Sequence, residues 1–269
     1  MSTKTYPSFS QAFLLLLYMF VASLAGLPGY LPYLIWKNDF THALGDISLY
    51  LAAVIIPTVY AAKRIKKSAH SFSLKLLFRK KINTSQVIYL AFLTVSIGIC
   101  IDYIIRLLHL PNFFTAEIDR TLKLPWLGFV ALVILPAFFE ELLLRGIILE
   151  QFLKRYSAGS AVLLSAFLFG LMHGNPSQIF AGFVAGCFLG WVYFKTKNIK
   201  YCILIHFVNN GVSWIEFQLT DRLPANSFVK AIKGLDANLP IFIMALLVSV
   251  IGIYLLNKIC VNKTAWSGR

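Results

Sequence analysis

Long uncharged apolar runs alternate with short polar segments along almost the whole chain. A helix needs about 20 apolar residues to cross the hydrocarbon core of a bilayer, so we expect eight membrane-spanning helices. Their expected limits are 10–34, 46–62, 86–108, 125–149, 159–174, 177–195, 199–218 and 239–258. Pro57 and Pro136 interrupt two of these runs, which membrane helices tolerate where neighbouring groups satisfy the freed carbonyls. The pattern predicts an all-α fold, a polytopic membrane helix bundle in which residues 1–269 form a single membrane domain.

Composition supports a membrane protein. The chain is 58% hydrophobic and 13% charged, whereas ordinary soluble domains are about 45–50% apolar and 25% charged. The first apolar run is too long for the core of a cleavable signal peptide, so we interpret it as a retained span. The four cysteines are scattered and form no CxxC pair, so we interpret them as small buried hydrophobes.

Basic residues dominate the charge. The formal net charge is +14, and eight of the 25 Lys and Arg residues fall between Lys63 and Lys81. Apolar runs flank that stretch, so a loop facing anionic lipid explains it better than nucleic-acid binding. Its SFSLKLLF segment, residues 71–78, is expected to lie in the membrane interface as an amphipathic segment. We therefore expect membrane lipid as a partner and no nucleic acid.

The distribution of charge also predicts an orientation. With eight spans both termini lie on one side, and that side carries 17 Lys and Arg residues against seven on the other, Arg145 lying within a span. The positive-inside rule then places both termini in the cytoplasm. We expect a multi-pass protein of the cytoplasmic (inner) membrane of a prokaryote.

Small residues recur on one face of the expected helix 177–195. Gly182, Gly186 and Gly190 are spaced four apart. Such a stripe lets another helix backbone approach closely. We expect it to pack inside the bundle and not to form a dimer seam.

Two adjacent carboxylates lie inside the apolar run 125–149. A charged group there costs ~2.5–3.5 kcal/mol on insertion scales, so Glu140 and Glu141 are functional candidates. Glu141 and Arg145 are four residues apart, which predicts an ion pair on one helix face. Glu140 lies about 100° further round the helix, which favours it as the reactive group. The alternative is that all three form a salt-bridge network that locks helices together.

Two further polar clusters interrupt later apolar runs. His173 ends one run, and His206 and Asn210 are four residues apart on another. Taken singly, His173 fits an interfacial histidine, and the other two fit an interhelical hydrogen bond worth ~0.6–2 kcal/mol. Taken with Glu140, the set predicts a hydrolytic centre. Counted from the expected cytoplasmic ends of their helices, Glu140, His173 and His206 lie roughly 15, 20 and 9 Å deep, which predicts an opening on the cytoplasmic side.

Three short motifs occur in order in separate apolar runs. They are EELLLR with Glu140, Glu141 and Arg145, FGLMH with Phe169 and His173, and HFVNN with His206 and Asn210. They resemble the EExxxR, FxxxH and HxxxN motifs of the CAAX protease and bacteriocin-processing membrane family, and the resemblance covers about residues 125–215.

The resemblance implies a mostly eight-helix endopeptidase whose catalytic core is residues 125–215. It implies that Glu140 and His173 activate a water and that His206 and Asn210 stabilise the tetrahedral oxyanion, with Glu141 and Arg145 in support. The implied substrate is a peptide or protein, including prenylated CAAX proteins. Prokaryotic members of that family are also linked to bacteriocin maturation and immunity.

Three other interpretations are open at this point. Glu140, His173 and His206 match the ligand types of a His₂Glu zinc site, but no HExxH helix fixes two ligands at once, so a metal-free mechanism is favoured. Buried Glu and His also mark small transporters and proton relays, although no internal repeat supports one. A non-catalytic immunity or scaffold protein is the third alternative.

Overall fold

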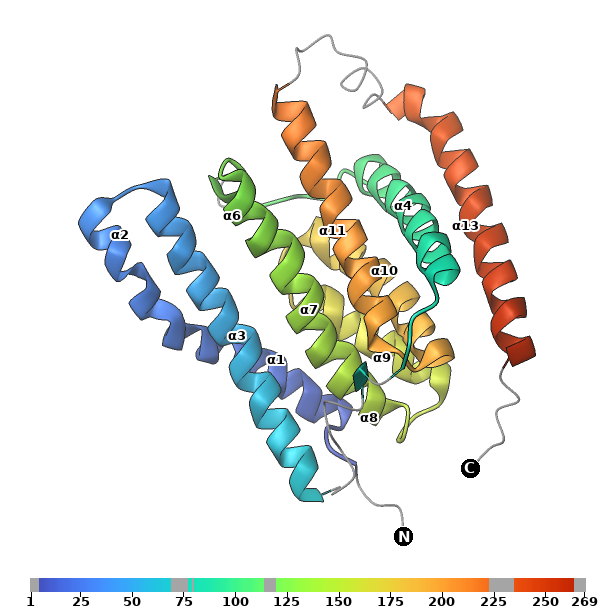
Figure 1. Ribbon diagram of the computed structural model, residues 1–269, viewed down its shortest axis with the longest axis horizontal. Helices are drawn as coiled ribbons and strands as arrows, with labels where there is room; N and C mark the ends of the chain where they lie inside the picture. Colours follow the sequence, from blue (N-terminus) through green and yellow to red (C-terminus); the bar gives the residue numbers. More distant parts are fainter. Residues whose placement is uncertain (1–4, 69–76, 79, 114–119, 223–234, 264–269) are drawn as a thin grey trace.

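The computed structural model describes residues 5–68, 77–78, 80–113, 120–222 and 235–263, and these form helices joined by short connections, without a strand among them (Figure 1). The helices, in chain order, are α1 (Phe9–Ser23), η1 (Leu24–Tyr30), α2 (Leu31–Trp36), α3 (Asp39–Ser68), α4 (Thr84–Leu107), α6 (Pro125–Phe129), η3 (Val130–Ile134), α7 (Leu135–Glu141), η4 (Leu142–Leu149), α8 (Glu150–Phe152), α9 (Ala158–Leu171), α10 (Pro176–Thr196), α11 (Ile199–Arg222) and α13 (Leu235–Lys263). The predicted all-α class is confirmed.

Six helical stretches are long and apolar enough to cross a membrane, which makes the chain an integral multi-pass membrane protein. They are Phe9–Trp36, Asp39–Lys67, Thr84–Leu107, Pro125–Phe152, Pro176–Thr196 and Leu239–Lys258. The two other expected spans correspond to α9 and α11. The first has only 14 residues, and the second carries polar residues such as His206 and Asn210 on its inward side. The count of eight spans stays a prediction.

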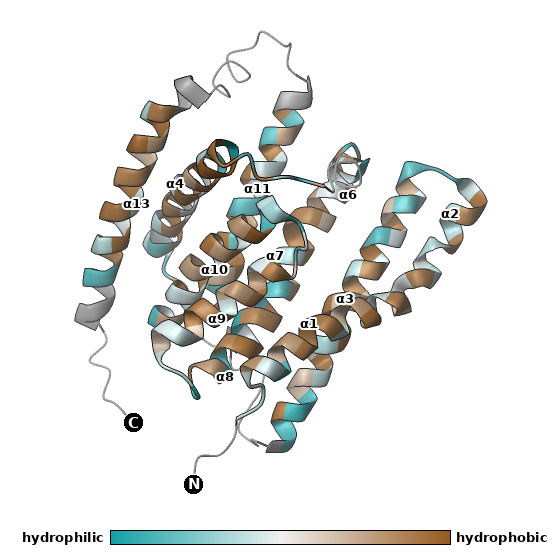
Figure 2. Ribbon diagram, turned by 180° about the vertical axis from the view of Figure 1, so that it is seen from behind, coloured by the Kyte–Doolittle hydropathy of each residue, from teal (hydrophilic) through white to brown (hydrophobic). Residues whose placement is uncertain are grey.

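The outer surfaces of the helices are apolar. Phe92 and Ile35 are each 72% exposed, and Trp126 is 84% exposed. Figure 2 shows hydrophobic residues along most of α4, α7 and α13, with hydrophilic residues gathered near helix ends. An aqueous surface would not tolerate so many exposed large side chains, so these faces suit lipid.

One end of the bundle gathers basic segments from distant parts of the chain. Arg155 donates to the Thr5 carbonyl oxygen at 3.2 Å, and Lys80 donates to the Thr196 carbonyl oxygen at 2.7 Å. We call this the basic end; it comprises 63–68, 80–83, 153–157 and 195–200. Helix α1 begins and α13 ends in the lower half of Figure 1, the half that holds the basic end. The side of the membrane stays a prediction, and the expected amphipathic segment 71–78 lies almost wholly outside the described residues.

Other contacts define the opposite end. Arg120 pairs with Asp39 at 3.8 Å, and Gln218 donates to the Leu122 carbonyl oxygen at 2.7 Å. We call this the far end; it comprises 37–46, 102–113, 120–124, 175–178 and 214–222.

The glycine stripe packs inside the bundle, as predicted. A Cβ built on Gly186 would lie 2.9 Å from the Cα of Ala166, and one on Gly182 would lie 3.1 Å from the Cα of Gly170. Both neighbours belong to α9. The stripe therefore lets α9 and α10 approach backbone to backbone, which positions the histidine at the end of α9 against α10.

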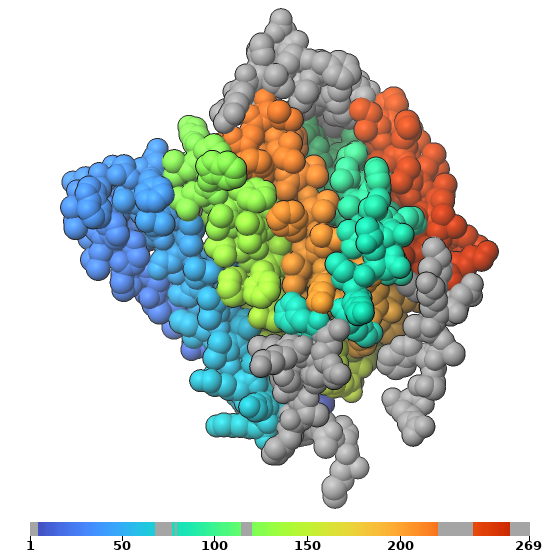
Figure 3. Space-filling view, viewed as in Figure 1, coloured from blue at the N-terminus to red at the C-terminus, as the bar shows by residue number. Residues whose placement is uncertain are grey.

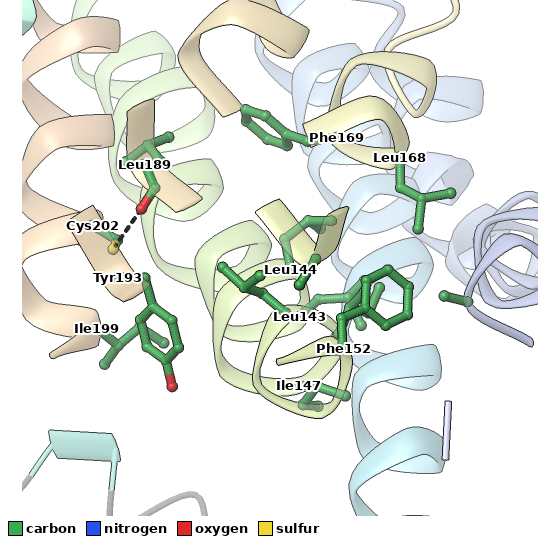
Figure 4. Packing of buried hydrophobic residues seen from close by; sticks show 14 of the residues in the cluster. Leu143, Leu144, Ile147, Phe152, Leu168, Phe169, Leu189, Tyr193, Ile199 and Cys202 are labelled. Carbon is green, nitrogen blue, oxygen red and sulfur yellow. Dashed lines mark hydrogen bonds between the residues drawn. The ribbon is translucent and has the colours of Figure 1, made fainter. Parts of the chain in front are cut away.

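The hydrophobic core fills the half of the bundle nearer the basic end. Leu143, Leu144, Ile147 and Phe152 are fully buried. Figure 4 shows this cluster facing Tyr193 and Ile199 from neighbouring helices, with the Cys202 thiol directed at the Leu189 carbonyl oxygen.

Candidate active site

The two glutamates lie on an irregular helical stretch. Residues Leu135–Glu141 form an α-helix between two π-helical segments, Val130–Ile134 and Leu142–Leu149. The expected span over 125–149 is therefore helical but not regular. Such π-helical segments occur frequently at functional sites.

Proline explains part of the irregularity. Pro136 has no N–H to donate to the carbonyl four residues earlier, that of Leu132. The side-chain amide of Asn210 donates to this carbonyl at 2.9 Å. A group on α11 thus supplies the donor that the proline lacks, as expected for prolines in membrane helices.

Glu140 is buried, with 6% of its surface exposed. Its Oε1 accepts a hydrogen bond from the Tyr50 hydroxyl of α3 at 3.1 Å. Its Oε2 has no hydrogen-bond partner among the described residues and lies 4.0 Å from Nε2 of His206. A gap of that length between two polar atoms suits a bridging water.

Glu141 joins two partners through one oxygen. Its Oε1 lies 2.8 Å from Nη1 of Arg145 and 2.9 Å from Nδ1 of His206. Both Glu141 and Arg145 are completely buried. The predicted i,i+4 ion pair is present, and the same carboxylate also orients the imidazole of α11.

Arg145 is held on three sides. Besides the ion pair, its Nη2 donates to the Gly186 carbonyl oxygen at 3.2 Å, and its guanidinium carbon lies 4.5 Å from the Phe169 ring centroid. A buried cation needs such partners to offset its lost hydration. The arginine thereby ties its own helix to α9 and α10.

The hydrogen bond to Glu141 restricts what His206 can do. With a proton on Nδ1 donated to the carboxylate, Nε2 carries a proton only in the imidazolium form. A neutral His206 in this arrangement presents Nε2 as an acceptor, and only the imidazolium presents it as a donor.

His173 has a different environment. Its Nδ1 lies 2.8 Å from the Phe169 carbonyl oxygen, which can only accept, so Nδ1 carries the proton and Nε2 is left as an acceptor. The Phe169 ring lies edge-on between the two imidazoles, 5.2 Å from His173 and 5.6 Å from His206 between ring centroids. The first residue of the FxxxH motif thus spaces the two histidines apart.

A cavity of about 950 Å³ unites these groups. Glu140, His173, His206 and Asn210 all line it, whereas Glu141 and Arg145 lie behind it. In Figure 3, the stretch 125–152, α11 and α4 lie side by side over this part of the molecule. The structure therefore brings the four predicted catalytic side chains to one space and puts the two supporting residues outside it.

The direction of the cavity differs from the expectation. Its lining reaches the far end, through Asp46, Arg106 and Leu122, and includes no residue of the basic end. The lining therefore gives no support to the expected opening on the side of the basic loop, and that opening stays a prediction. The depth count took equal, straight spans, whereas α9 has only 14 residues.

Sequence reasoning missed two neighbours of the site. Tyr50 bonds Glu140 from a helix with no recognised motif. Asn209 lines the cavity and donates to Oδ1 of Asn210 at 3.2 Å. The repeated Asn in HFVNN was a visible signal for Asn209, whereas nothing in the sequence around Tyr50 distinguishes it from an interfacial tyrosine.

The zinc alternative draws no support from this geometry. In the part of the chain that the structure describes, which contains Glu140, His173 and His206, no three His, Cys, Asp or Glu side chains are gathered as a metal ion requires. Each histidine engages its Nδ1, with the Phe169 carbonyl and with Glu141 respectively, and leaves Nε2 without such a bond, an arrangement that metal-ligating and metal-free histidines share. The residues do not fit a His₂Glu site as they stand.

A comparison with protein families agrees with the motifs. Residues 122–212 match the family model described as type II CAAX prenyl endopeptidase Rce1-like. This stretch runs from just before α6 to the middle of α11 and contains Glu140, His173, His206 and Asn210. No curated protein and no solved structure matches the chain.

Proposed function

Residues 122–212 belong to the type II CAAX prenyl endopeptidase Rce1-like family, and from this premise we propose that the protein is an intramembrane endopeptidase that hydrolyses a peptide bond with a water activated by Glu140 and His173. The substrate is a peptide or protein that enters the cavity from the membrane or its surface, whether or not it carries a prenyl group. Membrane lipid surrounds the bundle.

The observation that carries the proposal is the free oxygen of Glu140. Its Oε2 is buried and without a hydrogen-bond partner among the described residues, and it belongs to a residue that lines the cavity. A buried acceptor left unpaired is costly, by about 1–3 kcal/mol, unless a water or substrate satisfies it. A water there would be held by a carboxylate that can take its proton.

His173 would assist this step. Its Nδ1 proton is committed to the Phe169 carbonyl, so its Nε2 can accept a hydrogen bond or a proton. Two acceptors on residues that line one cavity would orient a water and raise its nucleophilicity. The proton taken from water is then available to the leaving amine.

His206 and Asn210 would stabilise the oxyanion. With its Nδ1 hydrogen-bonded to Glu141, His206 is a donor at Nε2 in its imidazolium form. One amide N–H of Asn210 donates to the Leu132 carbonyl oxygen, and the second amide N–H is available for the oxyanion. Preorganised donors of this kind contribute about 10²–10³ each in rate. Because Glu141 and Arg145 are buried behind the cavity, they act by fixing these groups in place.

We propose that the reaction needs no metal ion. In this mechanism Glu140 and His173 transfer the proton and His206 donates a hydrogen bond, so the three side chains perform their parts without a metal ion. Activity that survives a strong chelator, without added metal, would agree with this.

The test compares protein termini in membranes that contain either the wild-type chain or its Glu140→Gln variant at matched expression. A protease predicts specific termini that vanish in the variant, and the cut positions name the substrates. Glu150→Gln is the matched control, because Glu150 follows on the same helical stretch, pairs with Lys197 at 3.1 Å and does not line the cavity. Identical profiles for Glu140→Gln and wild type would refute the proposal and favour a scaffold or immunity role.

A further inference from the structure

The cavity that holds Glu140 is open in one direction along the bundle. Its lining includes Asp46 in the first turns of α3, Arg106 at the end of α4 and Glu216 near the end of α11. All three belong to or border the far end. On α3 and α4 the lining residues come mainly from the half of the helix that lies away from the basic end, and on α11 they extend from Ile205 to Glu216.

The other direction is closed by the core. Leu143, Leu144, Ile147 and Phe152 follow Glu140 along the chain toward the basic end and are completely buried. Tyr193 and Ile199 meet them from other helices (Figure 4). This packed layer lies between Glu140 and the basic end among the described residues.

The rim of the cavity is polar. Arg106 and Asp102 form an ion pair at 2.8 Å, and their side chains are 29% and 56% exposed. Charged side chains in membrane helices face the bundle interior or a water-filled cavity. We therefore expect water to reach the site through the far end.

The two ends differ strongly in charge. Among the described residues, the far end carries Asp39, Asp46, Asp102 and Glu216 together with Lys37, Arg106, Arg120 and Lys123, whereas the basic end carries eleven Lys and Arg residues with Glu150 beside them. Basic segments next to spans stay in the cytoplasm, and Asp and Glu have little influence on orientation. The basic end is therefore the cytoplasmic one.

From these relationships we propose that the cavity is entered from the extracytoplasmic side of the membrane. Taken together with the proposed function, on which this second part rests, the substrates are peptide segments exposed on that side: exported chains, or the outer ends of membrane-anchored ones.

Paired serine-to-cysteine variants test the direction of access without any need for activity. Ser213→Cys lies on α11, is exposed and lines the cavity; Ser85→Cys is exposed in the first turn of α4 at the basic end. Each full-length variant is placed in sealed right-side-out and inside-out vesicles and treated with a permanently charged, membrane-impermeant thiol reagent. The parent chain gives the background of the four native cysteines, and buried Ser249→Cys gives a negative control.

We expect Ser213→Cys to react several-fold faster in right-side-out vesicles and Ser85→Cys several-fold faster in inside-out vesicles. The reverse pattern would overturn the proposal, because the cavity would then face the cytoplasm. A Ser213→Cys variant that reacts in neither preparation while Ser85→Cys does would overturn it as well, since the cavity would hold no water path. Gln178→Cys, on the first turns of α10 in the same lining, provides a second probe if the α11 variant does not accumulate.

The two proposals can fail separately. Unchanged termini in the Glu140→Gln variant would refute the protease while leaving the labelling result in place. Termini that do vanish but map to cytoplasmic segments of the substrates would uphold the protease and overturn extracytoplasmic entry.

Discussion

Glu141 and His206, 65 residues apart in sequence, share a hydrogen bond of 2.9 Å between Oε1 and Nδ1. The same oxygen accepts from Arg145. The second glutamate of the EExxxR motif is thus the residue that links it to the HxxxN motif. This arrangement gives the adjacent glutamates distinct positions: Glu140 faces the cavity, and Glu141 fixes the groups around it.

Replacing Glu141 with Gln should lower kcat while leaving KM nearly unchanged. Gln removes the negative charge that Arg145 and His206 share at Oε1, so His206 would be held less firmly where the oxyanion needs it. The loss should approach the ~10²–10³-fold that removal of one oxyanion donor typically costs. Steady-state kinetics on a substrate identified by terminus mapping would measure this. A rise in KM at constant kcat would show that Glu141 acts only in binding.

Replacing Tyr50 with Phe should slow turnover several-fold without lowering the thermal unfolding midpoint. The change removes the hydroxyl that bonds Glu140 at 3.1 Å and keeps the ring. Tyr193→Phe is the matched control, because its hydroxyl bonds Glu150 at 3.0 Å outside the cavity. Equal losses of kcat in both variants would argue that Tyr50 has no particular role at the site.

Arg145 should matter more for stability than for substrate binding. Arg145→Met leaves the completely buried Glu141 without its cation, and removing one partner of a buried pair typically costs about 3–5 kcal/mol. A lower thermal midpoint in detergent, measured beside Arg155→Met at the exposed basic end, would show this. A midpoint no lower than that of Arg155→Met would contradict the buried-network interpretation.

The sequence predicted which residues form the site better than it predicted the contacts between helices that surround them. Glu141 and Arg145 could be paired from spacing alone, because one helix fixes the separation of residues four apart. The link from Glu141 to His206 could not, since it depends on how α11 packs against α7. Tyr50 could not be assigned to the site for the same kind of reason, because its hydrogen bond to Glu140 depends on how α3 packs against α7. The extent of the cavity toward the far end could not be predicted, because residue counts assume straight spans of equal length, and α9 has only 14 residues.

Close packing of α9 on α10 should tolerate no added methyl at Gly186. A Cβ there would lie 2.9 Å from the Cα of Ala166, a backbone atom that cannot move alone. Overpacking of this kind typically costs about 1–3 kcal/mol, so Gly186→Ala should lower the thermal midpoint. It should also reduce activity, because the Gly186 carbonyl accepts from Arg145 and any shift of α10 disturbs that contact.

Gly159→Ala is the control on α9, where an added Cβ meets nothing within 4 Å. If both substitutions left the midpoint and the activity unchanged, the glycine stripe would not be what holds α9 and α10 together.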